Sequence, residues 1–205
     1  MTNILCFGDS NTWGYNPVDG SRYDEKTRWT GVLQGLLGTN THRIIEEGLN
    51  GRTTNHNEAE RPIRSGLQAL PILLESHRPL DWVVVMLGTN DFKTHFKSSA
   101  LEIVENLGLV CDAIQTNATL EGHPPHILLV SPTGIDSRSE ELPEWFRGAD
   151  QIARDLPPLL KKLAASKGID FMDAAEIIEH QFQDGLHWSR SQHFDFAHHL
   201  GKMLT

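Results

Sequence analysis

Six consecutive apolar residues, Trp82 to Leu87, place the strongest limit on how this chain can fold. Three of the six are valines, and β-branched side chains favour strands. A run that does not alternate with polar residues predicts a strand buried on both faces, as in the centre of a parallel sheet covered by helices on each side. The run therefore indicates an α/β fold.

Strand-like and helix-like segments alternate along the whole chain. Short apolar runs predict five strands, over residues 4–7, 43–46, 82–87, 127–130 and 169–173. Apolar residues at helical spacing predict helices over residues 29–37, 65–77, 99–114, 152–167 and 191–204. Pro71 should lie in the first turn of its helix or kink it, and Pro157-Pro158 should bend or restart theirs. We expect one domain, residues 1–205, with a three-layer α/β/α fold, a five-stranded parallel sheet and right-handed crossovers.

Composition excludes several classes of partner. The net charge of -9 and the lack of a Lys/Arg stripe argue against binding to nucleic acid or to an anionic membrane. No apolar run approaches the roughly 18–20 residues that a membrane span needs. The first strand begins within a few residues of Met1, so we expect no signal peptide and a cytoplasmic protein. Cys6 and Cys111 are interpreted as buried apolar residues, and the histidines of the last helix lack partners at metal-ligand spacing.

Polar residues follow the predicted strands at the points where they end. Ser10 follows the first strand, Gly51 the second and Asn90 the third, while Asp184 and His187 follow the last. In open α/β sheets, ligands bind at this carboxyl edge. The turn-rich segment 133–148 should form an ordered loop over the same site.

These residue types can together hydrolyse an ester. Ser10 would be the nucleophile and His187 its base, and a spacing of three residues lets Asp184 reach the Nδ1 atom of His187. The backbone N–H groups of Ser10 and Gly51 and the side-chain amide of Asn90 would bind the oxyanion. Each motif alone has a structural explanation: Asn90 could cap a helix, Asp184 and His187 could be a surface pair, and Asp91 is interpreted as bonding the amides of its own turn.

The sequence resembles the SGNH (GDSL-type) hydrolases in four blocks that occur in the order of that family. They are Gly8-Asp9-Ser10, the turn from Gly48 to Gly51, Gly88-Thr89-Asn90-Asp91 and Asp184-x-x-His187. Longer strings are similar to the bacterial arylesterase/acyltransferase branch, namely Cys6 to Ser10, Arg28 to Leu33, Glu46 to Leu49, Arg52 to Thr54 and Met86 to Asp91.

This resemblance implies a flavodoxin-like sheet and a serine esterase acting on small short-acyl (acetyl or aryl) esters, possessing acyltransferase or perhydrolase activity where water is excluded. It gives Ser10, His187 and Asp184 the roles of nucleophile, base and base partner, and it implies no metal, no cofactor and a homo-oligomer. Lys93 is similar to a lysine near the site in the acyltransferase branch. Asn11 replaces a residue that is often aliphatic and makes the mouth of the site more polar.

Aromatic residues lie beside several motifs. We interpret Tyr15, Phe92, Trp145 and Phe146 as packing residues, whereas Trp13 and Trp188 are equally consistent with packing and with a substrate contact. The predicted substrate-binding residues are therefore Asn11, Trp13, Lys93 and Trp188.

Three other functions remain open. Within the same family, the alternative is a carbohydrate O-deacetylase. Outside it, the chain could be a catalytically inactive binding module, against which the intact Ser10, Asp184 and His187 argue. A nucleotide-binding protein could use the turn from Gly8 to Gly14 to hold phosphate, but neither G-x-x-x-x-G-K-[ST] nor G-x-G-x-x-G occurs.

Overall fold

The structure, a computed structural model, describes residues 1–117, 124–179 and 183–204. Within these residues, five strands form one parallel sheet in the order β2-β1-β3-β4-β5. The strands are β1 (Thr2–Gly8), β2 (His42–Gly48), β3 (Trp82–Met86), β4 (His126–Ser131) and β5 (Asp170–Asp173). The predicted α/β fold with five parallel strands is confirmed.

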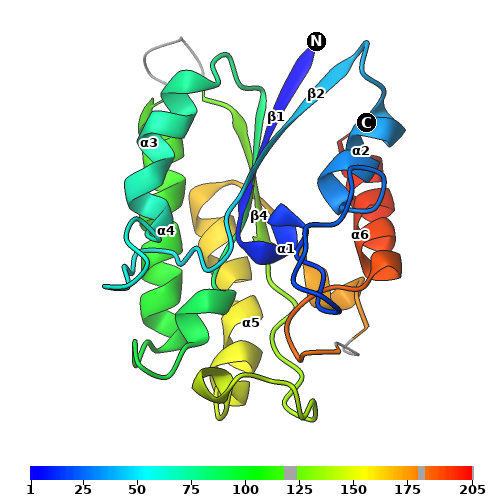
Figure 1. Ribbon diagram of the computed structural model, residues 1–205. Helices are drawn as coiled ribbons and strands as arrows, with labels where there is room; N and C mark the ends of the chain where they lie inside the picture. The colour runs from blue at the N-terminus through cyan, green and yellow to red at the C-terminus, as the bar shows by residue number, and fades with distance from the viewer. Residues whose placement is uncertain (118–123, 180–182, 205) are drawn as a thin grey trace.

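Helices cover both faces of the sheet (Figure 1). The helices α3 (Gly66–Ser76), α4 (Ala100–Asn117) and α5 (Asp150–Lys167) pack on one face, and α2 (Trp29–Leu37) and α6 (Arg190–Met203) pack on the other. Strand β1 contributes side chains to the cores on both faces. Leu5 and Phe7 pack in the core under α3, α4 and α5, while Ile4 and Cys6 pack in the core under α2 and α6. Side chains alternate along a strand, so an unbroken apolar run supplies both cores.

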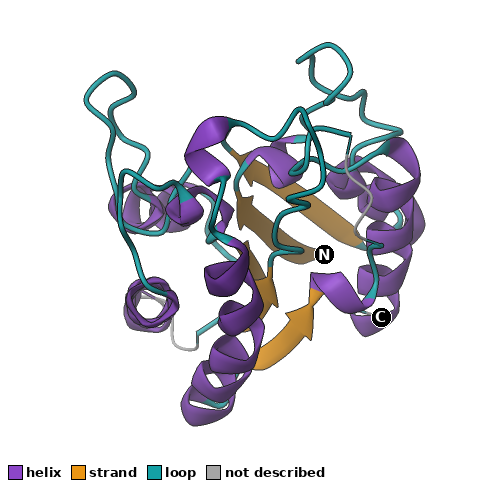
Figure 2. Ribbon diagram, turned by 90° about the horizontal axis from the view of Figure 1, so that it is seen from below, coloured by secondary structure: helices purple, strands orange, loops and turns teal. Residues whose placement is uncertain are grey.

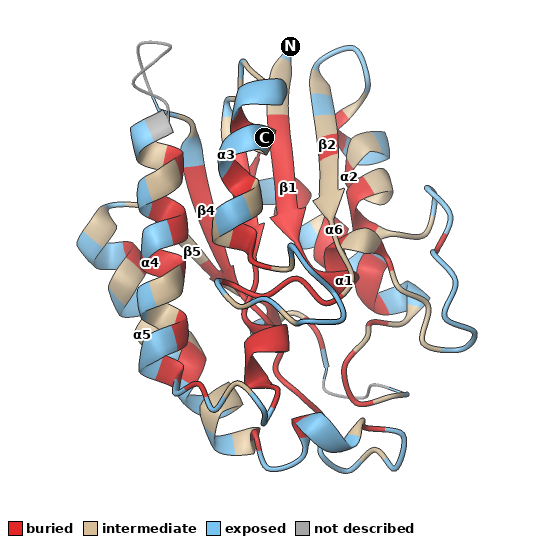
Figure 3. Ribbon diagram, turned by 60° about the vertical axis from the view of Figure 1, so that its left-hand side comes forward, coloured by how far each residue is buried: buried red, intermediate tan, exposed pale blue. Residues whose placement is uncertain are grey.

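Burial follows position in the sheet. The inner strands β1 and β4 are buried, whereas β2 at the edge is half-buried along most of its length (Figure 3). No helix among the described residues combines the length and the apolar character that crossing a membrane requires.

The prolines lie inside helices that continue past them. Pro71 lies beyond the first turn of α3, and Pro157 and Pro158 lie inside α5, which runs on as one helix to Gly168. Each proline removes one backbone hydrogen bond, but Leu156 and Leu160 of α5 are buried against the sheet. We attribute the continuity of α5 to this packing. The predicted capping box of α4 is present, with Ser99 and Glu102 bonding reciprocally.

The strands all end at the same edge of the sheet, because they are parallel. Figure 2 looks onto this edge and shows the connecting loops gathered over it. Short helices follow several of the strands: α1 (Ser10–Trp13) follows β1, and the 3-10 helix η1 (Thr89–Phe92) follows β3. Two more 3-10 helices, η3 (Glu144–Phe146) and η4 (Ala174–Glu176), lie in the later connections.

Candidate active site

Ser10 begins helix α1 directly after the turn that ends β1. Asp9 caps this helix by accepting a hydrogen bond from the N–H of Asn11, at 3.1 Å. A Cβ atom on Gly8 would lie 2.1 Å from Thr12 Oγ1, so only glycine lets α1 fold back so closely over the strand end. The tight turn leaves Ser10 lining the cavity at the edge of the sheet.

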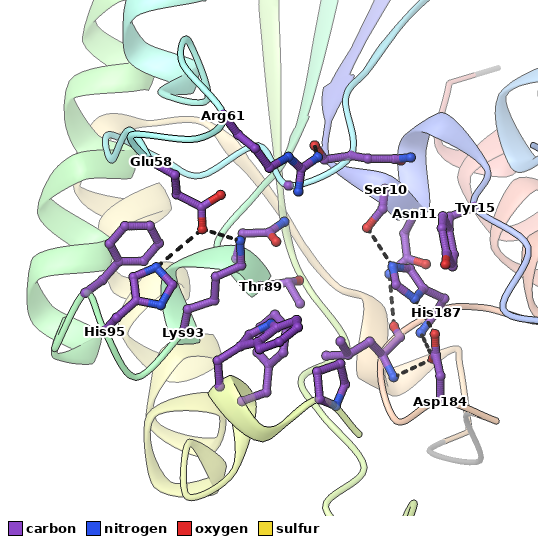
Figure 4. Close-up of a pocket in the computed structure, with 18 of the residues that line it drawn as sticks. Ser10, Asn11, Tyr15, Glu58, Arg61, Thr89, Lys93, His95, Asp184 and His187 are labelled. Carbon is purple, nitrogen blue, oxygen red and sulfur yellow. Dashed lines mark hydrogen bonds and ion pairs between the residues drawn. The ribbon is translucent and has the colours of Figure 1, made fainter. Parts of the chain in front are cut away.

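A chain of hydrogen bonds joins Ser10, His187 and Asp184 (Figure 4). Ser10 Oγ lies 2.9 Å from His187 Nε2, and His187 Nδ1 lies 2.6 Å from Asp184 Oδ2. An ionised carboxylate can only accept, so Nδ1 carries the ring proton and Nε2 is left to accept from the serine hydroxyl. The structure thus brings together the three residues that the sequence analysis selected.

Asp184 is held by its own turn. Its Oδ1 accepts the backbone N–H groups of Leu186 and His187, at 3.0 and 2.9 Å. Burial by itself would raise the pKa of Asp184, but the bond and the charge interaction with His187 and these two amides outweigh it and hold the pKa below its usual value. Asp184 therefore stays ionised beside His187.

Gly51 and Asn90 line the same cavity as Ser10. Gly51 adopts a φ of 80°, which disfavours other residues. The side-chain amide of Asn90 donates one N–H to the carbonyl of Arg52, at 3.1 Å, which fixes the orientation of the amide. An amide carries two N–H groups, so the other can serve a ligand in the cavity.

A buried network joins the loops that carry these donors. The Arg52 guanidinium donates to the carbonyls of Gly8, at 2.9 Å, and Glu47, and burial lowers the pKa of Arg52 to about 10. Asp91 accepts from the N–H of Thr54, at 2.9 Å, and from its hydroxyl. The interpretation of Asp91 is thereby corrected, because its main partner belongs to the loop after β2 rather than to its own turn.

Asn11 connects Ser10 to the segment that carries His187. Its amide nitrogen donates to the carbonyl of Leu186, at 3.2 Å, and its amide oxygen accepts the N–H of Trp188, at 3.0 Å. Asn11 lines the cavity, as the prediction of a substrate contact requires, but both of these bonds position His187 relative to Ser10.

The aromatic residues are distributed differently from the prediction. Trp188 is fully buried against Phe196, and its indole N–H donates to Thr133, so no substrate contact is open to it. Trp13 lies outside the cavity lining, with Arg22 over its ring. In contrast, Tyr15, Trp145 and Phe146 line the cavity, although the sequence suggested packing roles.

The cavity has a volume of about 1030 Å³ and extends well beyond Ser10. Glu141, Pro143, Trp145 and Phe146 contribute to its wall, as predicted for the loop 133–148.

Lys93 also lines the cavity, where its Nζ atom lies 2.8 Å from Glu58. Sequence reasoning missed Glu58, Arg61 and His95, since they lie in polar loops that carry no periodic or motif signal. Among the residues that the structure describes, no group of three His, Cys, Asp or Glu side chains is placed to hold a metal ion.

Comparisons with known proteins agree with this geometry. A model of the GDSL-like lipase/acylhydrolase family matches residues 6–200. The structure is similar to the native aryl esterase of M. smegmatis, with 36% identity, 100% of this chain and 98% of that chain covered, and a TM-score of 0.92. It is also similar to Est24, a carbohydrate acetylesterase from Sinorhizobium meliloti, with 34% identity, coverage of 100% and 98%, and a TM-score of 0.91.

A putative arylesterase from Agrobacterium tumefaciens is similar as well, with 32% identity, coverage of 100% and 98%, and a TM-score of 0.89. Among curated protein sequences, none is similar enough to this chain to count as a relative.

Proposed function

The chain belongs to the GDSL-like lipase/acylhydrolase family and is an SGNH-type esterase, and we propose that it hydrolyses small short-acyl esters through Ser10, His187 and Asp184. The observation that carries this proposal is the hydrogen-bonded chain from Ser10 Oγ through His187 to Asp184. A serine with such a partner can give up its proton as it attacks a carbonyl.

In the first half of the cycle, Ser10 Oγ attacks the ester carbonyl carbon and its proton passes to His187 Nε2. The carbonyl oxygen becomes an oxyanion, which accepts from the N–H groups of Ser10 and Gly51 and from the amide of Asn90. The intermediate collapses when the bond to the alcohol oxygen breaks and His187 returns its proton to that oxygen. The acyl group is left on Ser10.

In the second half, water repeats the attack with His187 again as base, which releases the acid and restores Ser10. Asp184 keeps the His187 ring in the required tautomer and stabilises the imidazolium that forms in both halves. An alcohol or a peroxide that takes the place of water would receive the acyl group instead, so acyl transfer is part of the same proposal. Adding an alcohol to the assay and measuring the new ester tests this branch.

The test is the turnover of p-nitrophenyl acetate by the wild type and by Ser10→Ala, together with labelling of Ser10 by an organophosphonate. We expect turnover in the wild type, loss of it in the variant, and label on Ser10 alone. Equal rates in the two proteins would show that Ser10 is only a turn residue. Stability of the fold in the presence of nucleotides would test the alternative that the first turn binds phosphate.

Deacetylation of carbohydrates is the second candidate. The cavity combines the aromatic side chains of Phe96 and Trp145 with the charged groups of Glu58 and Arg61. Aromatic faces pack on sugar rings and charged groups bond to hydroxyls, and Est24 is described as a carbohydrate acetylesterase. A higher kcat/KM for an acetylated sugar than for phenyl acetate would favour this candidate, and the reverse would favour an arylesterase.

A further inference from the structure

We propose that the ion pair of Lys93 and Glu58 sets the acyl-chain limit of this esterase, by placing charge where a long acyl chain would have to extend. The inference rests on the proposed function, since it assumes that Ser10 attacks the ester. It assigns a specificity role to Glu58, a residue outside the four motif blocks.

The pair is an ordered, largely buried part of the cavity wall. Lys93 Nζ lies 2.8 Å from Glu58 Oε1, and His95 Nε2 lies 3.3 Å from the same oxygen. Only 7% of the Lys93 side chain and 17% of the Glu58 side chain are exposed, yet both residues line the cavity. Burial opposes ionisation of Glu58, but the hydrogen bond and the charge of Lys93 hold its pKa below the usual value.

The proposal places the pair at the acyl end of the cavity. His187 must hand its proton to the leaving alcohol, so the alcohol occupies the His187 side of the reacting carbon. The oxyanion points to its proposed donors on Ser10, Gly51 and Asn90. The acyl substituent takes the remaining direction, also away from His187. In Figure 4, His187 and Asp184 lie at one end of the cavity, Glu58, Lys93 and His95 lie at the other, and Thr89 lies between them.

Charge at this end discriminates by chain length. An acetyl group ends near Ser10 and leaves the pair in contact with water. A long aliphatic chain would displace that water from two charged groups and offer them no hydrogen bonds, which is unfavourable. The expected substrates are therefore esters of acetate and similarly short acids, whereas the alcohol part, on the other side, is not limited by this pair.

The experiment compares kcat/KM for the acetate, butyrate and octanoate esters of p-nitrophenol in the wild type and in the double variant Lys93→Met/Glu58→Gln. The wild type should prefer acetate. The double variant should raise the ratio of octanoate to acetate about tenfold, the size of discrimination that a hydrophobic pocket gives for small differences in chain. Because the readout is a ratio within each protein, a general loss of activity does not affect it.

The matched control is Lys167→Met/Asp112→Asn, which removes another lysine–carboxylate pair, 2.5 Å apart, between α5 and α4 and outside the cavity lining. Its ratio should equal that of the wild type. A rise of less than about threefold in the Lys93/Glu58 variant, on the same scale, would overturn the proposal.

Glu58→Gln provides a second test that does not depend on the double variant folding. It leaves the Lys93 ammonium without its carboxylate, so p-nitrophenyl hemisuccinate, whose acyl group is anionic, should gain relative to the neutral butyrate, and added salt should reduce the gain. An unchanged ratio would contradict the proposal. A wild type that hydrolyses octanoate as fast as acetate would defeat this inference alone, whereas no turnover of any ester and no label on Ser10 would defeat the proposed function.

Discussion

The turn from Asp184 to His187 shows how a spacing of three residues can build a hydrogen-bonded histidine–carboxylate pair, which we propose to be catalytic. The same carboxylate that bonds the His187 ring also accepts two backbone N–H groups of its own turn, so the position of Asp184 is fixed by local structure. Little tertiary support is then needed to aim Nε2 of His187 at Ser10. Asn11 supplies that support through its bonds on either side of His187.

Replacing Asp184 by asparagine tests this arrangement. Asparagine keeps one acceptor oxygen but can also donate from its nitrogen, which favours the tautomer with the proton on Nε2 of His187. We expect kcat to fall by roughly 10³- to 10⁴-fold, while circular dichroism stays that of the wild type. Near-normal turnover in a folded Asp184→Asn protein would remove Asp184 from the mechanism.

Asn90 provides the second test at this scale. Asn90→Ala removes the side-chain donor that we propose for the oxyanion, a species that exists only around the transition state. We expect kcat to fall by about 10²–10³-fold with little change in KM. Steady-state kinetics would show this, and a change confined to KM would instead assign Asn90 to ground-state binding.

At the scale of elements, the site depends on loops that follow neighbouring parallel strands. Arg52 joins the loop after β2 to the end of β1, and Asp91 joins the loop after β3 to Thr54. These bonds are buried, and they hold Gly51 and Asn90 at fixed positions relative to Ser10. The sheet alone would bring the loops near one another without fixing their separation.

Thr54→Val tests the contribution of this connection. Valine has the shape of threonine but no hydroxyl, so the buried Asp91 carboxylate loses one donor. We expect the free energy of unfolding, measured with denaturant, to fall by about 1–3 kcal/mol. Thr27→Val is the matched control, because the hydroxyl of Thr27 also bonds an aspartate, Asp24, but at an exposed position. A loss of equal size in both variants would contradict the role of the buried connection.

The elements themselves were predictable because each leaves a local pattern. Apolar runs located the strands, and helical spacing with caps located the helices. Helix α5 does not restart at Pro157 and Pro158, and we attribute this to burial of the helix, which outweighs two missing hydrogen bonds. The motif residues were predictable because parallel strands bring their ends together. The cavity wall was not predictable from the sequence. Glu58 bonds to Lys93, 35 positions away, and no periodic pattern signals this contact. Trp188 is next to His187 in sequence, but its side chain is buried in the core.

For the whole molecule, two expectations remain predictions, namely a homo-oligomer and a cytoplasmic location. Sedimentation of the purified protein would test the first of them.

The pH dependence of stability is another property of the whole molecule, because buried groups act on it in opposite directions. Burial raises the pKa of Asp9 to about 6 and that of Asp91 to about 7, so the folded state binds protons at these sites more readily than the unfolded chain. Their contribution to stability is greatest at low pH and is lost as pH rises through those values. His193 does the reverse, since burial lowers its pKa to about 3.

His193 is fully buried between the rings of Tyr23 and Trp188, and its Nδ1 atom accepts the N–H of Trp29, at 3.3 Å. It stays neutral in the folded protein while the unfolded chain takes up a proton below about pH 6.5, so stability is lost as pH falls from there toward 3.

His193→Asn keeps an acceptor for Trp29 but cannot titrate. The quantity to compare is the unfolding free energy of the wild type minus that of the variant. This difference should be about 2–3 kcal/mol smaller at pH 4.5 than at pH 7.5. Denaturant unfolding of both proteins at each pH measures the difference, in which the terms from Asp9 and Asp91 cancel. A difference that does not change with pH would mean that His193 is protonated within the fold.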